Sequence, residues 1–416
     1  MCPGQRITNK RVLILTQLFA PSIGVGALRS TFFSKYLPLF GWDPFIITSS
    51  EDYHPLLNTN ISGLPPQEKV VRIPGTNQVQ NDTILFRLNR LARIFYLPET
   101  TYTEKLYKGW VKVGMQVISR IQPDVILASS GPDSAYVAAY ILSKRTGIPF
   151  IIDFRDIAEQ FSLKTVSGKL RIQRIIKRRK KFTSAAAACT TVSNGLASQL
   201  ISKSGIEAKV IYNGFDHEIH ASLRGKEEGR EKFTICYAGR IWDPKHRDPR
   251  PLFNAIDRLI NNDVFHKENF LVQFVGTEPE LVNRFSEGFS CAGNIQIIPR
   301  VSYEESICYM MSANILLHLS HQQQKGILTT KLFDYMAVGR PILSIPGDGD
   351  EVDNLLIQTC SGISAGNIDS IVNFLETGYK QYTRDKAGKR VVEDLPMGFS
   401  RLESTKNLST LLNDIV

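Results

Sequence analysis

Two blocks of short apolar stretches alternate with helical segments along this chain, and this alternation limits the possible folds more than any other feature. The first block predicts strands at 11–16, 44–49, 124–129, 149–153, 187–192 and 208–213. The second block predicts strands at 233–239, 270–276, 295–299, 314–320 and 340–346. Short strands of consecutive apolar residues are typical of parallel sheets covered by helices on both faces. We therefore expect an α/β protein with two doubly wound domains.

A polar and charged segment, 213–233, separates the two blocks and contains three glycines. We interpret this segment as the linker between the domains. The length of 416 residues fits two domains of about 200 residues each. Within the first block, 51–82 is expected to be irregular, and helices are expected near 83–97 and over 103–121.

Composition excludes several classes of protein. No apolar run approaches the roughly 20 residues of a membrane-spanning helix, and the run VLIL after Arg11 fits a first strand better than a signal peptide. Six cysteines are scattered without CxxC spacing or nearby histidines. We expect reduced thiols, a cytoplasmic location and no bound metal.

Much of the formal net charge of +10 lies in one segment, GKLRIQRIIKRRKKF at 168–182, with eight Lys or Arg among fifteen residues. One interpretation is the solvated face of an ordinary helix. The other is a patch that binds an anionic membrane surface. The segment lacks the interleaved aromatic residues of single-strand binders, and no DNA-binding motif occurs, so we expect no nucleic acid partner.

Three loops at predicted strand ends are candidate ligand sites, because ligands of open α/β sheets bind beyond the carboxyl ends of the strands. The first is PSIGVGALRS at 21–30, where Gly24 and Gly26 would let a ligand approach the backbone in front of a helix. The alternative is a tight strand–helix turn without a ligand.

The second loop, YAGRIWDPK at 237–245, carries Arg240 and Lys245 five residues apart. Guanidinium binds pairs of oxygens and ammonium acts as a point charge, so the two cations suit a diphosphate. The alternative is a pair of ordinary surface cations.

The third loop precedes a helix predicted to start near Thr329 or Thr330, one of which would be its N-cap. The backbone N–H groups around Leu328, Thr329 and Thr330 would attract an anion. Asp334 lies one turn into this helix, where a carboxylate also favours the helix dipole without any ligand.

The order and spacing of several motifs resemble the retaining nucleotide-sugar glycosyltransferases of the GT-B fold, specifically glycosyltransferase family 4. The motifs are TQLFAPSIGVGALR at the start, IPFIIDFRD at 148–156, VIYNGFD at 210–216, YAGRIWDPKHRDPRPLF at 237–253, KLFDYMAVGRPIL at 331–343 and FSRLESTKNLSTLL at 399–412.

The resemblance implies a GT-B fold, in which two Rossmann-like domains face each other across a cleft. Residues 1–214 would bind the acceptor, 215–399 would bind the donor, and a final helix at 400–416 would pack back on the first domain. Arg240 and Lys245 match the family's pair of diphosphate-binding cations, which stabilise the leaving nucleotide. These cations replace a metal, so the resemblance implies no metal and no cofactor beyond the nucleotide-sugar substrate.

The acidic motif departs from the family pattern. Many members carry two glutamates separated by seven residues, and Asp334 matches the second, which binds the ribose hydroxyls. A carboxylate offers one oxygen to each of two adjacent hydroxyls. The first glutamate falls at Gly326 and is missing, so its role at the donor sugar is open. Gln322, Gln323 and Gln324 are candidate replacements.

The motif DFRD ends a strand on the acceptor side and brings Asp153, Arg155 and Asp156 near the predicted reaction centre. Arg155 between the two carboxylates opposes a raised pKa, which argues against a hydrolase pair. We interpret Arg155 and Asp156 as acceptor-binding residues, with Asp156 also catalytic. The alternative is an ion pair that closes the strand end.

We therefore expect a retaining, metal-independent glycosyltransferase at the inner face of a membrane, acting on a glycan or lipid-linked acceptor in surface polysaccharide biosynthesis. Two alternatives stay open. One is a nucleotide-sugar epimerase of the same fold, and the other is a non-catalytic nucleotide or nucleic-acid binding protein.

Overall fold

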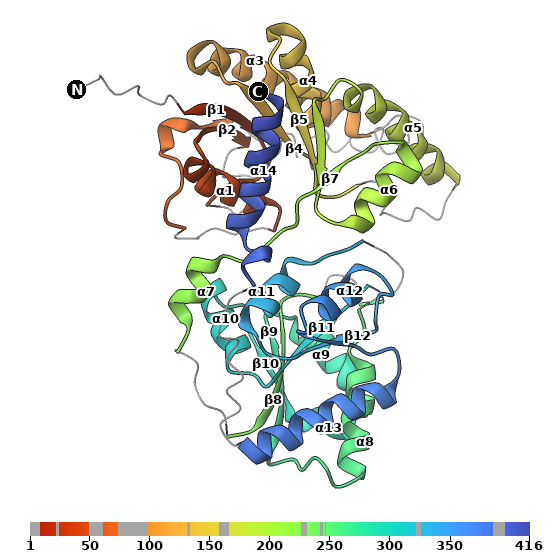
Figure 1. Ribbon diagram of the computed structural model, residues 1–416. Coiled ribbons are helices and arrows are strands. Elements are labelled where there is room, and N and C mark those ends of the chain that lie inside the picture. Colours follow the sequence, from red (N-terminus) through yellow and green to blue (C-terminus); the bar gives the residue numbers. More distant parts are fainter. Residues whose placement is uncertain are drawn as a thin grey trace, which may run out of the picture. The chain divides into compact units, whose positions relative to one another are not determined.

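The computed structural model describes residues 9–21, 25–49, 61–73, 98–130, 134–157, 166–225, 231–241, 244–245, 247–321, 326–385 and 396–416. The chain divides into two compact units, one of Met1–Tyr212 with Arg401–Val416 and one of Asn213–Ser400. Each unit has a parallel sheet with helices packed on it (Figure 1). The predicted α/β class with two doubly wound domains is confirmed.

The first unit is built on a parallel sheet with the order β3-β2-β1-β4-β5-β6-β7 in the described residues. Leu13 pairs with Phe45 on one side and with Ile126 on the other, so β1 is central. The strands are β1 (Lys10–Leu15), β2 (Trp42–Ser49), β3 (Val70–Ile73), β4 (Val125–Ser130), β5 (Phe150–Phe154), β6 (Ala188–Thr191) and β7 (Lys209–Val210).

Helices cover this sheet, and one of them comes from the far end of the chain. They are α1 (Val25–Tyr36), α3 (Pro98–Ile121), α4 (Ser134–Thr146), α5 (Val166–Thr183), α6 (Asn194–Ser204) and α14 (Arg401–Ile415). In Figure 1, α14 runs beside α1. Leu408 and Leu412 of α14 are buried in one apolar cluster with Trp42. Ser404 Oγ also donates to the carbonyl of Tyr212 at 2.8 Å, so the last helix is part of the first core.

The second unit is built on a parallel sheet with the order β10-β9-β8-β11-β12-β13 in the described residues. Its strands are β8 (Phe233–Ala238), β9 (Phe270–Val275), β10 (Ile295–Ile298), β11 (Ile315–Leu319), β12 (Ile342–Ile345) and β13 (Gly362–Ser364). Its helices are α7 (His217–Leu223), α8 (Arg250–Asn261), α9 (Pro279–Ser286), α10 (Tyr303–Met311), α11 (Thr330–Val338), α12 (Glu351–Gln358) and α13 (Ile368–Asp385). Because helices cover its strands, β8 is buried at all six positions.

Three elements differ from the sequence predictions. β3 lies within 51–82, which was wrongly predicted to be irregular throughout, and β13 was not predicted. The segment interpreted as a linker, 213–233, contains α7, which packs against α10 and α11 of the second unit. Asp216 caps α7 by accepting a hydrogen bond from the Glu218 amide at 3.1 Å. The predicted helix near 83–97 lies outside the described residues.

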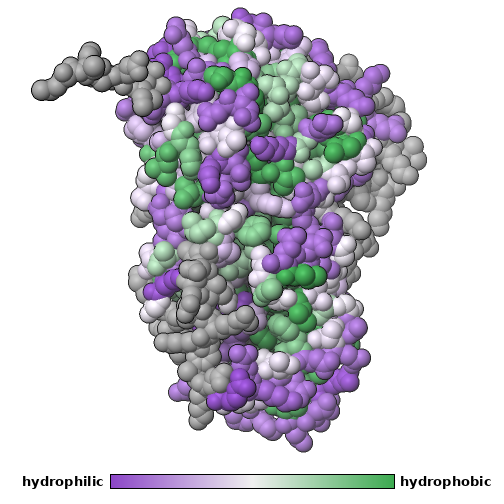
Figure 2. All heavy atoms as spheres, viewed as in Figure 1, coloured by the Kyte–Doolittle hydropathy of each residue, from purple (hydrophilic) through white to green (hydrophobic). Residues whose placement is uncertain are grey.

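Hydrophobic and hydrophilic residues are mixed on the face shown in Figure 2, where the hydrophobic ones form small groups. None of the helices in the described part of the chain has the length and apolar character needed to cross a bilayer.

The strand order of the second unit has a switch point between β8 and β11. Strands on one side of it continue through β9 and β10, and those on the other side continue through β12 and β13. Neighbouring loops diverge at such a point and leave a crevice outside the carboxyl ends of the strands. The strand order therefore predicts a ligand site at the carboxyl ends of β8 and β11.

Candidate functional site

Two of the predicted loops start from the switch-point strands of the second unit. Gly239 and Arg240 directly follow β8, and Ser320 directly follows β11. α11 begins at Thr330, ten residues after Ser320, and then leads into β12. The structure therefore places the loop with Arg240 and the start of α11 at the same edge of one sheet.

The two predicted diphosphate cations lie on the surface of the loop after β8. Arg240 is exposed, and its Nε donates to Oε1 of Glu278 at 2.6 Å. This hydrogen bond is the main cause of the lowered pKa of Glu278. Lys245 is also exposed. Arg240 and Glu278 help to line a shallow hollow of about 330 Å³ together with Leu281 of α9.

The start of α11 has the features of an anion-binding helix end. Thr329 is its N-cap, with extended backbone angles of φ −79° and ψ 146°, and its side chain makes no capping hydrogen bond. Leu328 is buried and Thr330 is half-buried. Because no side chain caps the helix, its first N–H groups are available to a negatively charged ligand.

Asp334 is held by two side chains that sequence analysis did not identify. The phenol of Tyr303, on α10, donates to Oδ1 of Asp334 at 2.5 Å. Nε2 of His220, on α7, lies 3.4 Å from the same oxygen. Asp334 is buried and lies beyond the first turn of α11. Its position is therefore set by side-chain contacts, and helix-start electrostatics alone does not account for it.

The family pattern places its first glutamate at position 326. Here that position is a glycine whose backbone contacts a carboxylate from another loop. Gly326 has a φ of 75°, a conformation that disfavours any residue with a side chain. Its amide donates to Oδ2 of Asp350 at 2.7 Å. Asp350 is the N-cap residue of α12, yet its side chain does not cap that helix. Gln322, Gln323 and Gln324 lie outside the described residues.

A buried histidine lies beneath the start of α11. Nδ1 of His318, on β11, lies 3.0 Å from Ser344 Oγ, and Nε2 lies 3.4 Å from Thr329 Oγ1. Burial, followed by the positive charges of Arg247 and Lys331, lowers the pKa of His318 to about 3. The imidazole is therefore neutral at pH 7 and connects the strand ends to the N-cap of α11.

In the first unit, Asp153 is a structural residue rather than part of a reaction centre. It is 1% exposed, and its carboxylate accepts two hydrogen bonds of 2.9 Å from Arg29. Thr190 Oγ1 donates to it at 2.7 Å. Burial raises the pKa of Asp153, but the charge and hydrogen bonds of Arg29 and the hydrogen bond of Thr190 outweigh burial and lower it overall.

Arg155 and Gly26 are brought together. Nη1 of Arg155 donates to the Gly26 carbonyl, and a Cβ atom at position 26 would lie 2.8 Å from that nitrogen. Gly26 therefore makes room for the half-buried Arg155. Asp156 is exposed. Gly24 lies outside the described residues.

The basic segment forms α5, but its cations do not all face the solvent. Arg179 is 2% exposed and its guanidinium lies 5.4 Å from the ring centre of Phe154. Lys177, Lys180 and Lys181 are exposed. Any membrane-binding patch on α5 therefore excludes Arg179.

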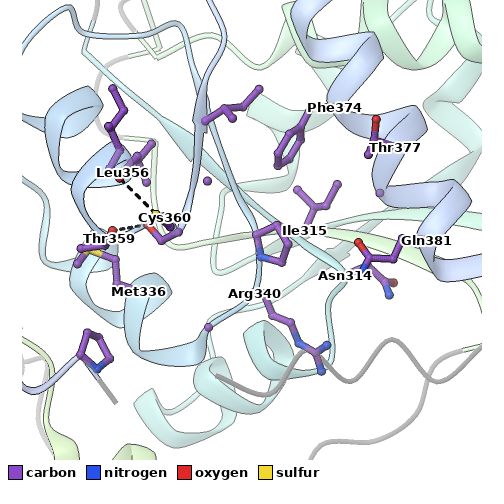
Figure 3. Close-up of a pocket in the computed structure, with 18 of the residues that line it drawn as sticks. Asn314, Ile315, Met336, Arg340, Leu356, Thr359, Cys360, Phe374, Thr377 and Gln381 are labelled. Atoms are coloured by element: carbon purple, nitrogen blue, oxygen red, sulfur yellow. Dashed lines mark hydrogen bonds between the residues drawn. The ribbon is translucent and has the colours of Figure 1, made fainter. Parts of the chain in front are cut away.

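A second cavity, larger than the hollow beside Arg240, lies at the opposite edge of the sheet of the second unit. It has a volume of about 630 Å³, and its lining includes Asn314 and Pro341, which lie just before the first residues of β11 and β12 (Figure 3). It is therefore separate from the crevice at the strand carboxyl ends.

Among the described residues, no cluster of three or more His, Cys, Asp or Glu is arranged to hold a metal ion.

Comparison with known proteins adds a family and a fold. Residues 35–219 match the model of Glycosyltransferase Family 4. The solved structure of sucrose-phosphate synthase from Thermosynechococcus elongatus is similar over 98% of this chain and 99% of that chain, with 12% identity and a TM-score of 0.65. The chain has the GT-B fold, and residues 35–219 carry its match to glycosyltransferase family 4.

Other solved structures share this fold. The lipopolysaccharide outer core galactosyltransferase WaaB, in its apo form, is 12% identical and has a TM-score of 0.56, covering 98% of this chain and all of that one (100%). UDP-GlcNAc 2-epimerase from Neisseria meningitidis, bound to UDP-GlcNAc, is 12% identical, with a TM-score of 0.55 and coverage of 97% and 100%. No curated protein sequence matches the chain.

Proposed function

We propose that this glycosyltransferase moves a sugar from a nucleotide-diphosphate sugar to a hydroxyl group of a glycan or lipid-linked acceptor, with retention of the anomeric configuration. The bond from the anomeric carbon to the diphosphate breaks, and a bond to the acceptor oxygen forms on the same face of the sugar. Surface polysaccharide biosynthesis at the inner face of the cell membrane is the proposed setting.

The observation that carries this proposal is the pairing of an uncapped helix start with a fixed carboxylate on the same helix. The N–H groups at Leu328, Thr329 and Thr330 suit the diphosphate. Asp334 is held by Tyr303 at 2.5 Å, which keeps a hydrogen-bond acceptor ready for a ribose hydroxyl. One helix would therefore bind both parts of a nucleoside diphosphate.

Arg240 and Lys245 would stabilise the charge that develops on the leaving nucleoside diphosphate. Both are exposed on the loop after β8, at the edge where α11 starts. Fixed cations that act on a developing negative charge lower the barrier to bond breaking. This role replaces that of a metal ion, so we propose that the reaction is metal-independent.

In the first unit, Asp156 and Arg155 would bind the acceptor, and Asp156 would also act at the reaction centre. Asp156 is exposed directly after β5 and next to Arg155, which Gly26 holds. We therefore propose two roles for Gly26. Its carbonyl positions Arg155, and its lack of a side chain lets the donor approach the backbone closely.

The test is an assay of a panel of UDP-, GDP- and ADP-sugars with and without glycan acceptors. We expect turnover that needs the acceptor and persists in excess EDTA. Arg240→Met should lower turnover about tenfold or more, because charge-assisted hydrogen bonds contribute about 1.5–3 kcal/mol each. Arg258→Met is the matched control, since Arg258 is exposed and paired with Asp369. Wild-type turnover in Arg240→Met would remove this residue from the site.

A nucleotide-sugar epimerase is the second candidate, because the UDP-GlcNAc 2-epimerase structure shares the fold over 97% of this chain. An epimerase converts a UDP-sugar without an acceptor. Interconversion of a nucleotide sugar in the acceptor-free arm of the assay would favour this function. Release of nucleoside diphosphate only when acceptor is present would favour the transferase.

A further inference from the structure

Lys331 is a cation in an unfavourable place. It is the second residue of α11, in the first turn, where the helix dipole favours negative charge and opposes positive charge. Nothing in the local sequence explains a lysine at this position. Its contacts in the folded protein provide the explanation.

The ammonium group of Lys331 is fixed over the carboxyl end of β8. Nζ donates to Tyr237 Oη at 3.0 Å and to the carbonyl of Arg240 at 3.3 Å. It also lies 4.4 Å from the ring centre of Tyr237, a favourable cation–π distance. Tyr237 Oη in turn donates to the same Arg240 carbonyl at 3.1 Å.

Gly239 makes room for this side chain. A Cβ atom at position 239 would lie 2.3 Å from Cε of Lys331, closer than any real contact. Gly239 also has a φ of 114°, which favours glycine. The turn after β8 is therefore shaped so that Lys331 can lie across it, at the carboxyl end of β8.

The positive charge of Lys331 is not neutralised by a carboxylate from the described residues, whereas Arg240 pairs with Glu278 at 2.6 Å. The charge of Arg247 adds to that of Lys331, because both contribute to the lowered pKa of His318 after burial. Nε of Arg247 is buried and makes no hydrogen bond within the described part of the chain. Asp353 acts on the same imidazole in the opposite direction but is the smallest of these causes, so positive charge predominates around His318, and an anionic ligand would balance it.

We propose that Lys331 is a third phosphate-binding cation of the donor site, held in position by Tyr237. An ammonium group has three N–H donors, and two of them bind Tyr237 and the Arg240 carbonyl. The third is left for a phosphate oxygen of the nucleoside diphosphate. This inference rests on the proposed function, because it adds a residue to the same donor site.

The experiment compares binding to the wild type and to Lys331→Met by calorimetry, with UDP, GDP, their nucleosides and inorganic pyrophosphate as probes. Met keeps the length and apolar stem of the side chain but removes its charge. We expect Lys331→Met to bind the nucleoside diphosphates and pyrophosphate about tenfold more weakly, or about 1.4 kcal/mol. Nucleoside binding should stay unchanged, and the dependence of affinity on salt should become less steep.

Two further variants separate a phosphate contact from a structural role. Lys380→Met is the control, because Lys380 is an exposed lysine paired with Glu376 in the same unit. Tyr237→Phe keeps the ring under the ammonium and removes one anchor, so it should weaken diphosphate binding by less than Lys331→Met. Equal losses for the diphosphate and the nucleoside would mean that Lys331 only shapes the site, and the inference would be wrong.

Unchanged diphosphate affinity in Lys331→Met, with binding retained by the wild type, would overturn the inference and leave the proposed function standing. If the wild type binds none of the nucleoside diphosphates, the proposed function fails first, and the role of Lys331 fails with it. Failure of the inference would therefore be seen in Lys331→Met, and failure of the proposed function would be seen in the wild type.

Discussion

The phenol of Tyr303 lies 2.5 Å from Oδ1 of Asp334, and Nε2 of His220 lies 3.4 Å from the same oxygen. No described residue donates a hydrogen bond to Oδ2. One oxygen of the carboxylate is therefore taken by the protein. The sequence suggested that both oxygens would bind the two ribose hydroxyls, whereas this geometry offers mainly Oδ2 to a ligand.

We expect Asp334→Asn to raise the apparent Michaelis constant of the donor about tenfold, because the amide loses the charge and one acceptor oxygen. Tyr303→Phe should raise it by less, since the carboxylate remains but its rotamer is no longer fixed. Asp334→Glu should be tolerated only partly, because the longer side chain must displace Tyr303. Steady-state kinetics over a range of donor concentrations measures all three.

A 2′-deoxy donor provides the control for this contact. It should bind the wild type more weakly than the ribo-donor but lose little further affinity in Asp334→Asn. Equal handling of the two donors by the wild type would show that Asp334 does not bind the 2′-hydroxyl.

The buried ion pair of Asp153 and Arg29 predicts a large loss of stability on mutation. Asp153→Asn removes the carboxylate charge that balances the buried guanidinium of Arg29, which we expect to lower the free energy of unfolding by about 3 kcal/mol or more. Asp43→Asn is the control, because the Asp43–Lys69 pair is 25% and 27% exposed and should contribute less than about 1 kcal/mol. Urea unfolding measures both, and similar small losses would show that Asp153 is not essential to the core.

The same pair has a defined pH dependence. The pKa of Asp153 is below its ordinary value of 3.8 in the folded protein. The unfolded chain therefore takes up a proton first as the pH falls. The stabilising contribution is complete well above pH 3.8 and is lost as the pH drops through the lower folded-state pKa.

The buried His318 predicts a second loss of stability as the pH falls. This loss begins at a higher pH than the loss from Asp153. Its pKa is about 3 in the folded protein against an ordinary value of 6.5. The unfolded state binds a proton below pH 6.5 and the folded state does not, so stability falls as the pH drops from 6.5 towards 3. The slope from this group is at most about 1.4 kcal/mol per pH unit.

Urea unfolding of His318→Gln between pH 7 and pH 4.5 tests this effect. The variant keeps a hydrogen-bonding side chain but cannot be protonated, so its stability should depend less on pH than that of the wild type. His266→Gln, at an exposed position, should keep the wild-type dependence. Parallel pH profiles for wild type and His318→Gln would contradict the assignment.

Sequence periodicity was sufficient to predict the fold, because continuous apolar strands require cover on both faces of a parallel sheet. It missed β3 and β13, which have only four and three residues and partly exposed side chains. The contacts of Asp334 were not predictable for a different reason. Tyr303 and His220 come from α10 and α7, and only the folded chain brings these helices to α11.

Residues with the same charge and neighbouring positions in the sequence differ in their burial in the folded protein. Arg179 lies among exposed lysines in the sequence but packs on Phe154. Asp153 and Asp156 both follow the same apolar strand residues, yet one is buried with Arg29 and the other is exposed. Whether a charged side chain faces the core or the solvent depends on tertiary packing, which a short motif does not encode.

We predict that position 326 does not tolerate the glutamate that the family pattern has there. Gly326→Glu must adopt a φ of 75°, which costs about 1–2 kcal/mol for a residue with a Cβ, and it brings a second carboxylate next to Asp350. We expect lower stability in urea unfolding and no gain in transferase activity. Gly366→Glu, at an exposed glycine with open space around its Cβ position, should be nearly neutral. Higher activity in Gly326→Glu would show that the site accepts the missing glutamate.

The exposed lysines of α5 provide the test of membrane binding. Clustered cations near an anionic surface contribute about 1 kcal/mol each, so three of them can hold a protein weakly on a membrane. We expect the wild type to sediment with vesicles containing phosphatidylserine or phosphatidylglycerol at low salt and to dissociate at high salt. The triple variant Lys177→Glu, Lys180→Glu, Lys181→Glu should stay in the supernatant.

This variant leaves Arg179 in place because a glutamate there would be buried against Phe154 and would unfold the first unit. Its thermal midpoint and its activity on a soluble acceptor should therefore remain close to those of the wild type. The control reverses three exposed lysines elsewhere, Lys203, Lys209 and Lys406, and should still bind vesicles if the patch on α5 is specific. If both triple variants lose binding equally, net charge rather than α5 attracts the protein. If the wild type ignores anionic vesicles at low salt, the exposed lysines of α5 are only the solvated face of a helix.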